Sequence, residues 1–190
     1  MKKNYFSLST FLLTLVLASL ACTVFVGGPD YSQRPVIPVS AEALESLKLQ
    51  IEQAMQNGAQ SGVVTLQINE TQITSYLAFK LAADSNPMFT DPQVYLRDGQ
   101  MQIYGKSQRG MFTANIGIIV SVGIDETGQP AIEIVSADFG PFPVPGGLKD
   151  ALTAAIREAY TGTLGPVATG FRIESITIAD GLMTVTGRIK

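Results

Sequence analysis

Few side chains in this 190-residue chain could do covalent chemistry. Cys22 is the only cysteine, and the sequence has no histidine, the commonest general base and a frequent zinc ligand. The segment Gly105-Lys106-Ser107-Gln108-Arg109-Gly110 misses the spacing of a nucleophile elbow, and the carboxylates are scattered mainly over expected turns and helix surfaces. We therefore predict a protein that is not an enzyme, with no catalytic residue, no metal site and no cofactor.

Cys22 lies where a thiol can be acylated. Lys2 and Lys3 precede an apolar run from Phe6 to Val26, which is the pattern of an export signal. Ser19-Leu20-Ala21-Cys22 has the shape of a bacterial lipobox, although leucine is expected where Ser19 stands. Read as one helix, the apolar run would instead rise roughly 30 Å and span a bilayer. We favour a lipidated Cys22 over an uncleaved spanning helix, and either over a plain secretory signal.

Both attachments place the domain on the extracytoplasmic face of a bacterial membrane, in the cell envelope, because lysines mark the cytoplasmic side of such a segment. A net charge of -3 and the lack of a basic stripe make nucleic acid an unsuitable partner. The expected organisation is a signal or anchor over residues 1–26, a flexible Pro- and Gly-containing tether over 27–39, and a single α+β domain over 40–190.

Helical periodicity begins at Ser40, a candidate N-cap, and Gly58 is a candidate end of that helix. An alternating strand of Val64, Leu66 and Ile68 follows. Asn69 with Gln72 then resembles a capping box that starts a second helix. Apolar residues at helical spacing indicate a third helix, and they are Leu148, Leu152, Ile156, Ala159 and Tyr160.

Two Asp-Gly dipeptides predict two-residue type I′ hairpins, at Asp98-Gly99 and at Asp180-Gly181. The implied registers put apolar residues opposite each other on one face of each hairpin. These predicted pairs are Leu96 with Met101, Val94 with Ile103, Ile178 with Met183 and Ile176 with Val185.

One unbroken alternating series runs from Phe112 to Ile124 and predicts an unusually long, bent strand, with Gly117 and Gly123 as candidate bulges. Another strand is expected over about Ala131 to Phe139. The Pro- and Gly-rich segment from Phe139 to Gly147 then leads into the third helix and is our candidate for the rim of a binding site.

The two hairpins, Val94–Lys106 and Ile176–Arg188, share Asp-Gly, Met and Gly at matching positions, and each follows a helix. The domain is thus predicted to contain two pseudo-repeated helix-plus-hairpin units. The alternative is that two good Asp-Gly hairpins converge on one pattern.

The run from Ile68 to Leu77, with Val94-Tyr95-Leu96 and Asp98-Gly99-Gln100-Met101, resembles small extracytoplasmic bacterial proteins of the YpmS-like, YceB-like and LmeA-like kind. The similarity covers roughly residues 62 to 190. It implies a tubular lipid-binding (TULIP-like) fold, in which a long curved antiparallel sheet wraps around helices and can leave an apolar groove.

We expect non-catalytic binding of a lipid or other apolar ligand between sheet and helices. The alternative is a structural or protein-interaction module with a filled core, whose protein partner the sequence does not identify. The predicted ligand-binding residues are Ile73, Leu77, Leu81, Leu96, Met101, Phe112, Ile116, Ile118, Val120, Phe139, Phe142, Leu152 and Ile156.

Overall fold

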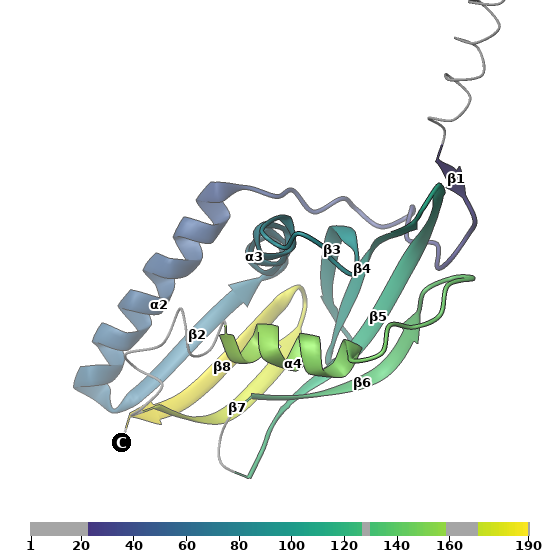
Figure 1. The fold of residues 1–190 in the computed structure, drawn as a ribbon. Helices are drawn as coiled ribbons and strands as arrows, with labels where there is room; N and C mark the ends of the chain where they lie inside the picture. The colour runs from purple at the N-terminus through teal and green to yellow at the C-terminus, as the bar shows by residue number, and fades with distance from the viewer. Residues whose placement is uncertain (1–22, 127–129, 159–170, 190) are drawn as a thin grey trace, which may run out of the picture.

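A computed structural model describes residues 23–126, 130–158 and 171–189 (Figure 1). Cys22 and the preceding apolar run, the side chain of Ile156, and residues Ala159 and Tyr160 lie outside what it describes. The helices are α2 (Ala41–Ser61), α3 (Glu70–Ala82) and α4 (Leu148–Glu158). The strands are β1 (Val24–Phe25), β2 (Val63–Asn69), β3 (Thr90–Arg97), β4 (Gln100–Arg109), β5 (Phe112–Ile124), β6 (Pro130–Asp138), β7 (Phe171–Ala179) and β8 (Leu182–Ile189). Within the described ranges, no helix combines the length and apolar character needed to cross a membrane.

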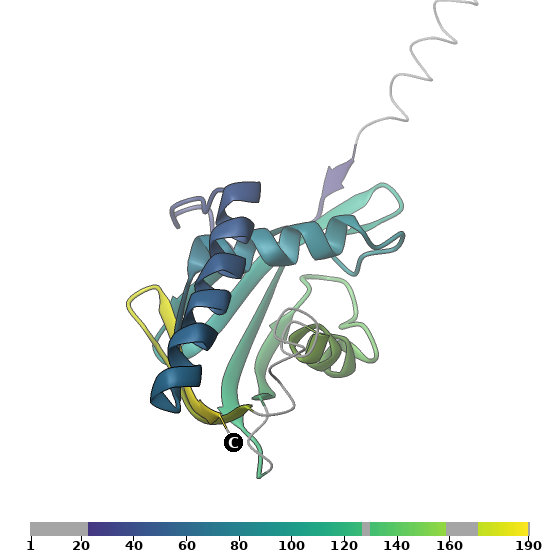
Figure 2. The ribbon, with the colours of Figure 1, turned by 90° about the vertical axis from the view of Figure 1, so that its left-hand side faces the viewer.

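The predicted α+β class is confirmed, with strongly curled sheets packed against helices (Figures 1 and 2). The strands form two sheets, where one was expected. In the first sheet β4 lies between β3 and β5, and both β6 and β1 pair with the other edge of β5. In the second sheet β8 lies between β2 and β7. The short β1 is parallel to β5, so the first sheet is mixed rather than purely antiparallel.

Helix α2 begins as predicted but ends later. The Ser40 side chain accepts from the backbone N–H of Ala43, so Ser40 is the N-cap. The helix continues to Ser61, and Gly62, with φ of 75°, is its C-cap in place of Gly58. Gly58 is instead buried in the contact between α2 and β2. A Cβ added there would lie 2.3 Å from Val64 Cγ2, so the missing side chain permits the close packing of α2 on β2.

Both predicted hairpins are confirmed in turn type and register. Asp98 and Gly99 have φ of 56° and 74°, and Asp180 and Gly181 have φ of 51° and 80°, as type I′ turns require. Leu96 pairs with Met101 and Val94 with Ile103 in the first hairpin, and Ile178 with Met183 and Ile176 with Val185 in the second. The hairpins follow α3 and α4 respectively, but they belong to different sheets.

The central strand β5 has 13 residues, as its alternation predicts. Its pairing with β6 shifts register between Ile119 and Val120, so the irregularity is not at Gly117 or Gly123. Gly117 instead lies under the ring of Tyr104, whose Cε1 would be 3.2 Å from an added Cβ. Its missing side chain therefore serves packing on the outer face of the sheet.

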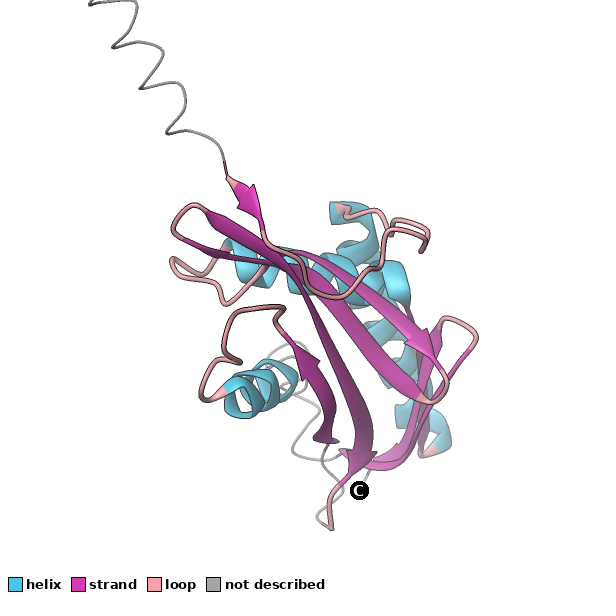
Figure 3. Cartoon of the chain, turned by 90° about the vertical axis from the view of Figure 1, so that its right-hand side faces the viewer, coloured by secondary structure: helices cyan, strands magenta, loops and turns pink. Residues whose placement is uncertain are grey.

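Residues 27–39, hereafter the strap, lie across the outer face of the first sheet (Figure 3), where we expected a flexible tether. Tyr95 Oη donates to the carbonyl of Pro35 over 3.1 Å. Ile37 is buried and exchanges two hydrogen bonds with the Gln93 side chain, of 2.7 and 3.2 Å. The outward-facing side chains of Gln93, Tyr95 and Tyr104 therefore bind the strap.

Aromatic and cationic groups complete the strap contact. The Arg34 guanidinium lies 4.9 Å from the ring centre of Tyr95 and 5.0 Å from that of Tyr104, and the Tyr31 ring is 5.1 Å from that of Tyr104. Cation–π contacts of this kind contribute about 0.5 to 2 kcal/mol each. The strap is therefore part of the folded domain.

The strap contact should weaken at alkaline pH. Burial raises the pKa of Tyr95, and burial together with the charge of Asp91 raises the pKa of Tyr31. A raised pKa favours the protonated phenol in the folded state, so this stability is present below pH 10 and is lost as pH rises through the raised values. Urea unfolding on either side of pH 10.0 should show the loss. Tyr95→Phe should reduce this alkaline loss of stability. An unchanged pH dependence in that variant would show that the Tyr95 phenol does not cause the loss.

Candidate functional site

The interior between the first sheet and helices α3 and α4 brings together most of the predicted ligand-binding residues. Of the predicted residues whose side chains the structure describes, one continuous apolar cluster contains all except Phe112. The fully or nearly buried members of the predicted set are Leu96, Met101, Ile116, Ile118, Val120, Phe139 and Leu152, and the half-buried members are Ile73, Leu77, Leu81 and Phe142. The predicted set therefore divides into a core and a partly open surface.

The sheet side of this interior is filled by protein. Leu96, Ile116 and Ile118 have 0% of their surface exposed. Side chains buried to this extent pack against several neighbours and need no ligand to cover them. These residues therefore form the core that supports a site, while accessible apolar surface lies on the helix side.

Helix α3 has an unusual distribution of polar and apolar residues. Its buried side chains are polar: Gln72 is 2% exposed, and Thr74 and Ser75 are 0% exposed. Its large apolar residues Ile73 and Leu77, by contrast, are only half-buried against the core. An ordinary surface helix buries its apolar stripe and exposes its polar one. The half-covered stripe of Ile73, Leu77 and Leu81 is hereafter the α3 inner face.

The buried polar side chains explain how α3 is held. Gln72 closes a capping box with Asn69 and also donates to Gln50 Oε1 of α2 over 3.0 Å. Ser75 Oγ accepts from the backbone N–H of Ser40, at the start of α2, over 3.1 Å. These hydrogen bonds join α3 to α2 and satisfy polar groups that burial would otherwise destabilise.

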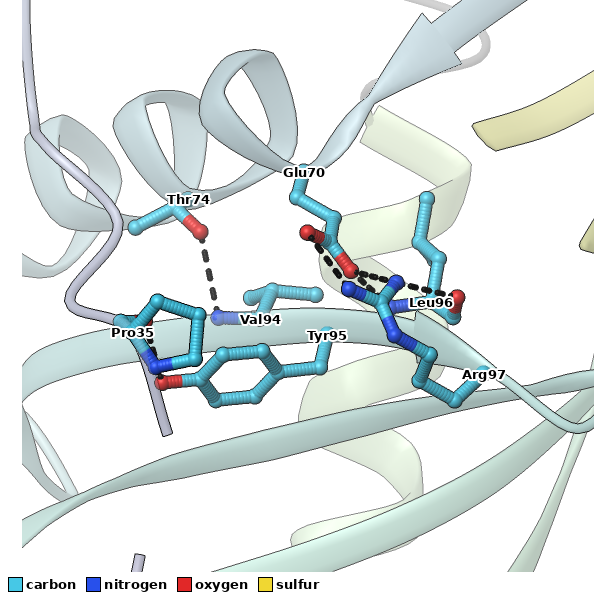
Figure 4. A network of polar contacts seen from close by, with 7 residues as sticks. All are labelled: Pro35, Glu70, Thr74, Val94, Tyr95, Leu96 and Arg97. Atoms are coloured by element: carbon cyan, nitrogen blue, oxygen red, sulfur yellow. Dashed lines mark hydrogen bonds and ion pairs between the residues drawn. The ribbon is translucent and has the colours of Figure 1, made fainter. Parts of the chain in front are cut away.

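A second set of contacts joins α3 to the free edge of β3 (Figure 4). Thr74 Oγ1 accepts from the backbone N–H of Val94 over 3.1 Å, and Glu70 Oε1 accepts from that of Leu96 over 2.8 Å. Glu70 also forms an ion pair with Arg97. Strand edges have unpaired backbone groups that promote aggregation, and α3 satisfies two of them here. The sequence shows Glu70 only as a first-turn acid and contains no signal for this role.

The Thr74 contact makes a stability prediction. Thr74→Val should leave the buried N–H of Val94 without an acceptor and lower the free energy of unfolding by about 1 to 3 kcal/mol. Thr74→Ser keeps the hydroxyl and should cost about 0.8 kcal/mol for the lost methyl group. Chemical denaturation of both variants checks this, and equal losses would show that the hydroxyl does not matter.

The expected rim is only partly accessible. Phe139 is 2% exposed and belongs to the core, while Phe142 is half-buried against it and Val144 is 48% exposed. Gly147 has φ of 79° and its carbonyl accepts from the N–H of Ala151 in the first turn of α4. Phe142 and Val144 are thus the rim residues that an arriving ligand could touch.

A cavity of about 390 Å³ lies on the other side of α3, between α2 and α3 near the end of α4. It is hereafter the α2–α3 pocket, and its lining residues are Leu44, Leu47, Lys48, Tyr76, Phe79, Lys80, Ala83 and Glu158. Lys80 Nζ contacts both carboxylate oxygens of Glu158 at 2.6 Å, and this hydrogen bond raises the pKa of Lys80. Burial raises the pKa of Tyr76. None of the predicted ligand-binding residues lines this pocket, because Tyr76 and Phe79 lie off the stripe formed by Ile73, Leu77 and Leu81.

Phe112 lies apart from the rest of the predicted set. It is 44% exposed at the start of β5, where it pairs with Val24 of β1. Strand alternation places it in the same series as Ile116 and Ile118, but the core ends before it. It therefore does not belong to the interior.

Comparison with known proteins adds little. No family model matches the chain, and no curated protein sequence matches it. A crystal structure of lipopolysaccharide binding protein is structurally similar, with a TM-score of 0.29 and 13% sequence identity over 68% of this chain. The chain covers 49% of that protein, about half its length. The function of this domain therefore has to be inferred from its own residues.

Proposed function

We propose that this domain binds a lipid or another apolar ligand, without catalysis, against the α3 inner face. The ligand's apolar part would cover Leu77 and its neighbours and approach through Phe142 and Val144. The core residues of the sheet support this surface and do not contact the ligand. The α2–α3 pocket is the competing location.

The half-covered α3 inner face carries this proposal. Leaving Ile73, Leu77 and Leu81 partly exposed forgoes burial free energy of about 25 cal/mol per Å² of apolar surface. The buried Gln72, Thr74 and Ser75 fix the helix in the rotation that leaves these residues open. An apolar ligand would recover the lost burial energy, as it does in apolar pockets generally.

We further propose that the domain is attached to the outer face of a bacterial membrane through Cys22 or the apolar run before it. The support is the lysine-headed apolar sequence with its lipobox-like end. The described part of β1 favours the lipidated form: Val24 and Phe25 are extended and paired with β5, so they cannot belong to a spanning helix. Attachment of this kind would keep the domain beside a source of lipid.

One observation favours a different function. The complete burial of Leu96, Ile116 and Ile118 is what a structural or protein-interaction module with a filled core requires. Such a module would take up no lipid, so the two functions differ in a direct assay.

Uptake of a fluorescent phospholipid by the purified domain, starting at Thr23, distinguishes them. The proposed function predicts saturable binding that an unlabelled phospholipid displaces. Absence of uptake by a folded preparation would exclude lipid binding and favour the interaction module.

A further inference from the structure

Four large apolar side chains lie exposed together where β1 meets the end of the β4–β5 hairpin. They are Val24, Phe25, Met111 and Phe112, with exposed fractions of 45%, 61%, 50% and 44%. Single exposed apolar residues are common on protein surfaces, whereas a cluster of them marks an interaction site. Val24 and Phe112 are register partners on one face of the sheet and Phe25 alternates to the other face, so the cluster surrounds this tip of the sheet. This group is hereafter the β1 patch.

Backbone hydrogen bonds hold the patch in one piece. Val24 pairs with Phe112 in register, and its N–H donates to the carbonyl of Met111 over 2.7 Å. The N–H of Val26 donates to Thr113 O over 2.9 Å. Figures 1 and 3 show β1 lying along the end of β5, away from the helices. The patch is therefore a fixed surface outside the core and apart from the α3 inner face.

The hairpin turn displays Met111. Gly110 has φ of 59° and begins the two-residue turn between Arg109 and Phe112, as a type II′ turn requires. Arg109 is exposed beside the apolar residues. A cation next to exposed aromatic and aliphatic side chains suits an interface with anionic headgroups above apolar chains.

The chain that precedes the patch identifies its occupant. β1 begins two positions after Cys22, and the residues from Phe6 to Ala21 carry no charge and are mostly apolar, with only serines and threonines between. A short link of this kind cannot carry the domain far from whatever holds the preceding segment, since each residue spans at most about 3.6 Å. We propose that the β1 patch docks onto the surface of the lipid bilayer to which the chain is attached. This inference rests on the proposed membrane attachment and is independent of ligand binding at the α3 inner face.

Docking of the patch would set the orientation of the whole domain. Val24 and Phe25 would sit at the level of the headgroups with Met111 and Phe112 beside them. The β7–β8 hairpin, in contrast, has an apolar residue directly after its turn, Leu182, which is 40% exposed and distant from β1. It supplies a control, because its residue is exposed to a similar degree and lies at the end of another two-residue hairpin.

Tryptophan reporters test the docking, since the native sequence has no tryptophan. Met111→Trp, Phe25→Trp and Leu182→Trp are made separately in the full chain and reconstituted with vesicles of phosphatidylcholine and phosphatidylglycerol whose acyl chains carry bromine near the headgroup. Flotation measures attachment, and quenching with a blue shift measures contact with lipid. We expect strong quenching of the two patch reporters and little of Leu182→Trp. Phe25→Trp leaves the hairpin unchanged, so the test survives if Met111→Trp does not fold.

The other outcomes overturn the inference in distinguishable ways. Floated protein in which all three reporters behave alike would exclude specific docking while leaving the attachment intact. Protein that does not float would exclude both attachment and docking, without bearing on lipid uptake at the α3 inner face. Patch reporters already shielded from an aqueous quencher before vesicles are added would identify a protein, and not the bilayer, as the occupant.

Discussion

Leu77→Gln should weaken the uptake of a fluorescent phospholipid by about tenfold or more. Leu77 lies at the centre of the α3 inner face and is half-buried against the core. An amide placed there would lose its water on ligand binding without gaining a hydrogen-bond partner, at a cost of about 1 to 3 kcal/mol. Each 1.4 kcal/mol corresponds to about a tenfold change in affinity. The measurement is a titration followed by the fluorescence of the bound lipid.

Phe79→Gln is the matched control for this change. Phe79 is on the same helix and 43% exposed, but it lines the α2–α3 pocket. Uptake by Phe79→Gln should equal that of the native chain. Loss of uptake in Phe79→Gln with normal uptake in Leu77→Gln would move the binding site to the α2–α3 pocket.

Ile118→Ala should lower the free energy of unfolding by about 2 to 5 kcal/mol, as expected for truncation of a fully enclosed side chain. Ile118 has 0% of its surface exposed and lies in the middle of β5. Leu77→Ala should cost less, about 1 to 2 kcal/mol, because Leu77 is only partly buried and its exposed part loses no burial energy. This difference separates the core from the binding surface among the residues that the sequence predicts as one set.

Urea unfolding of both variants, with and without added phospholipid, provides the measurement. Lipid should stabilise Ile118→Ala as much as the native chain, because a ligand that binds only the folded state adds the same linkage energy to both. If Ile118→Ala lowered the free energy of unfolding only slightly and added lipid fully restored it, Ile118 would contact the ligand. This result would contradict our assignment of Ile118 to the core.

The features that could be predicted from the sequence are those that neighbouring residues determine. Asp98-Gly99 and Asp180-Gly181 specify their turns, and the turns then fix which residues pair. The Ser40 cap and the Asn69–Gln72 capping box likewise act within one helical turn. Alternation over β5 identified its full length because a strand with one buried face repeats every two residues.

The features that could not be predicted depend on contacts between distant segments. The strap has no periodicity, and its binding depends on Tyr95 and Tyr104, which stand about 60 to 70 residues further along the chain. The Pro and Gly content that suggested a free tether instead allows the strap to follow the outer face of the sheet. Its burial of Ile37 is decided by β3 and β4 and not by its own pattern.

The sequence predicted which apolar residues form the candidate site, but not which of them are enclosed in the core and which are partly exposed. The periodicity of apolar residues in the sequence placed Ile73, Leu77 and Ile118 on apolar faces. Periodicity cannot distinguish a residue enclosed by protein from one that is only partly covered. That distinction arises because Thr74 and Ser75 bond to β3 and to the start of α2 and thereby set the rotation of α3. Polar residues in the middle of a helix gave no sign of this role, since they normally face solvent.

Occupation of the α3 inner face by a lipid or similar apolar molecule can be measured by mass spectrometry. The sample is an organic extract of the purified domain, beginning at Thr23 and so free of any acyl group on Cys22. We predict a co-purifying lipid at a constant ratio to protein, and its depletion from an equal amount of folded Leu77→Gln. Extracts without lipid from the native domain, or the same lipid content in both preparations, would contradict the claim.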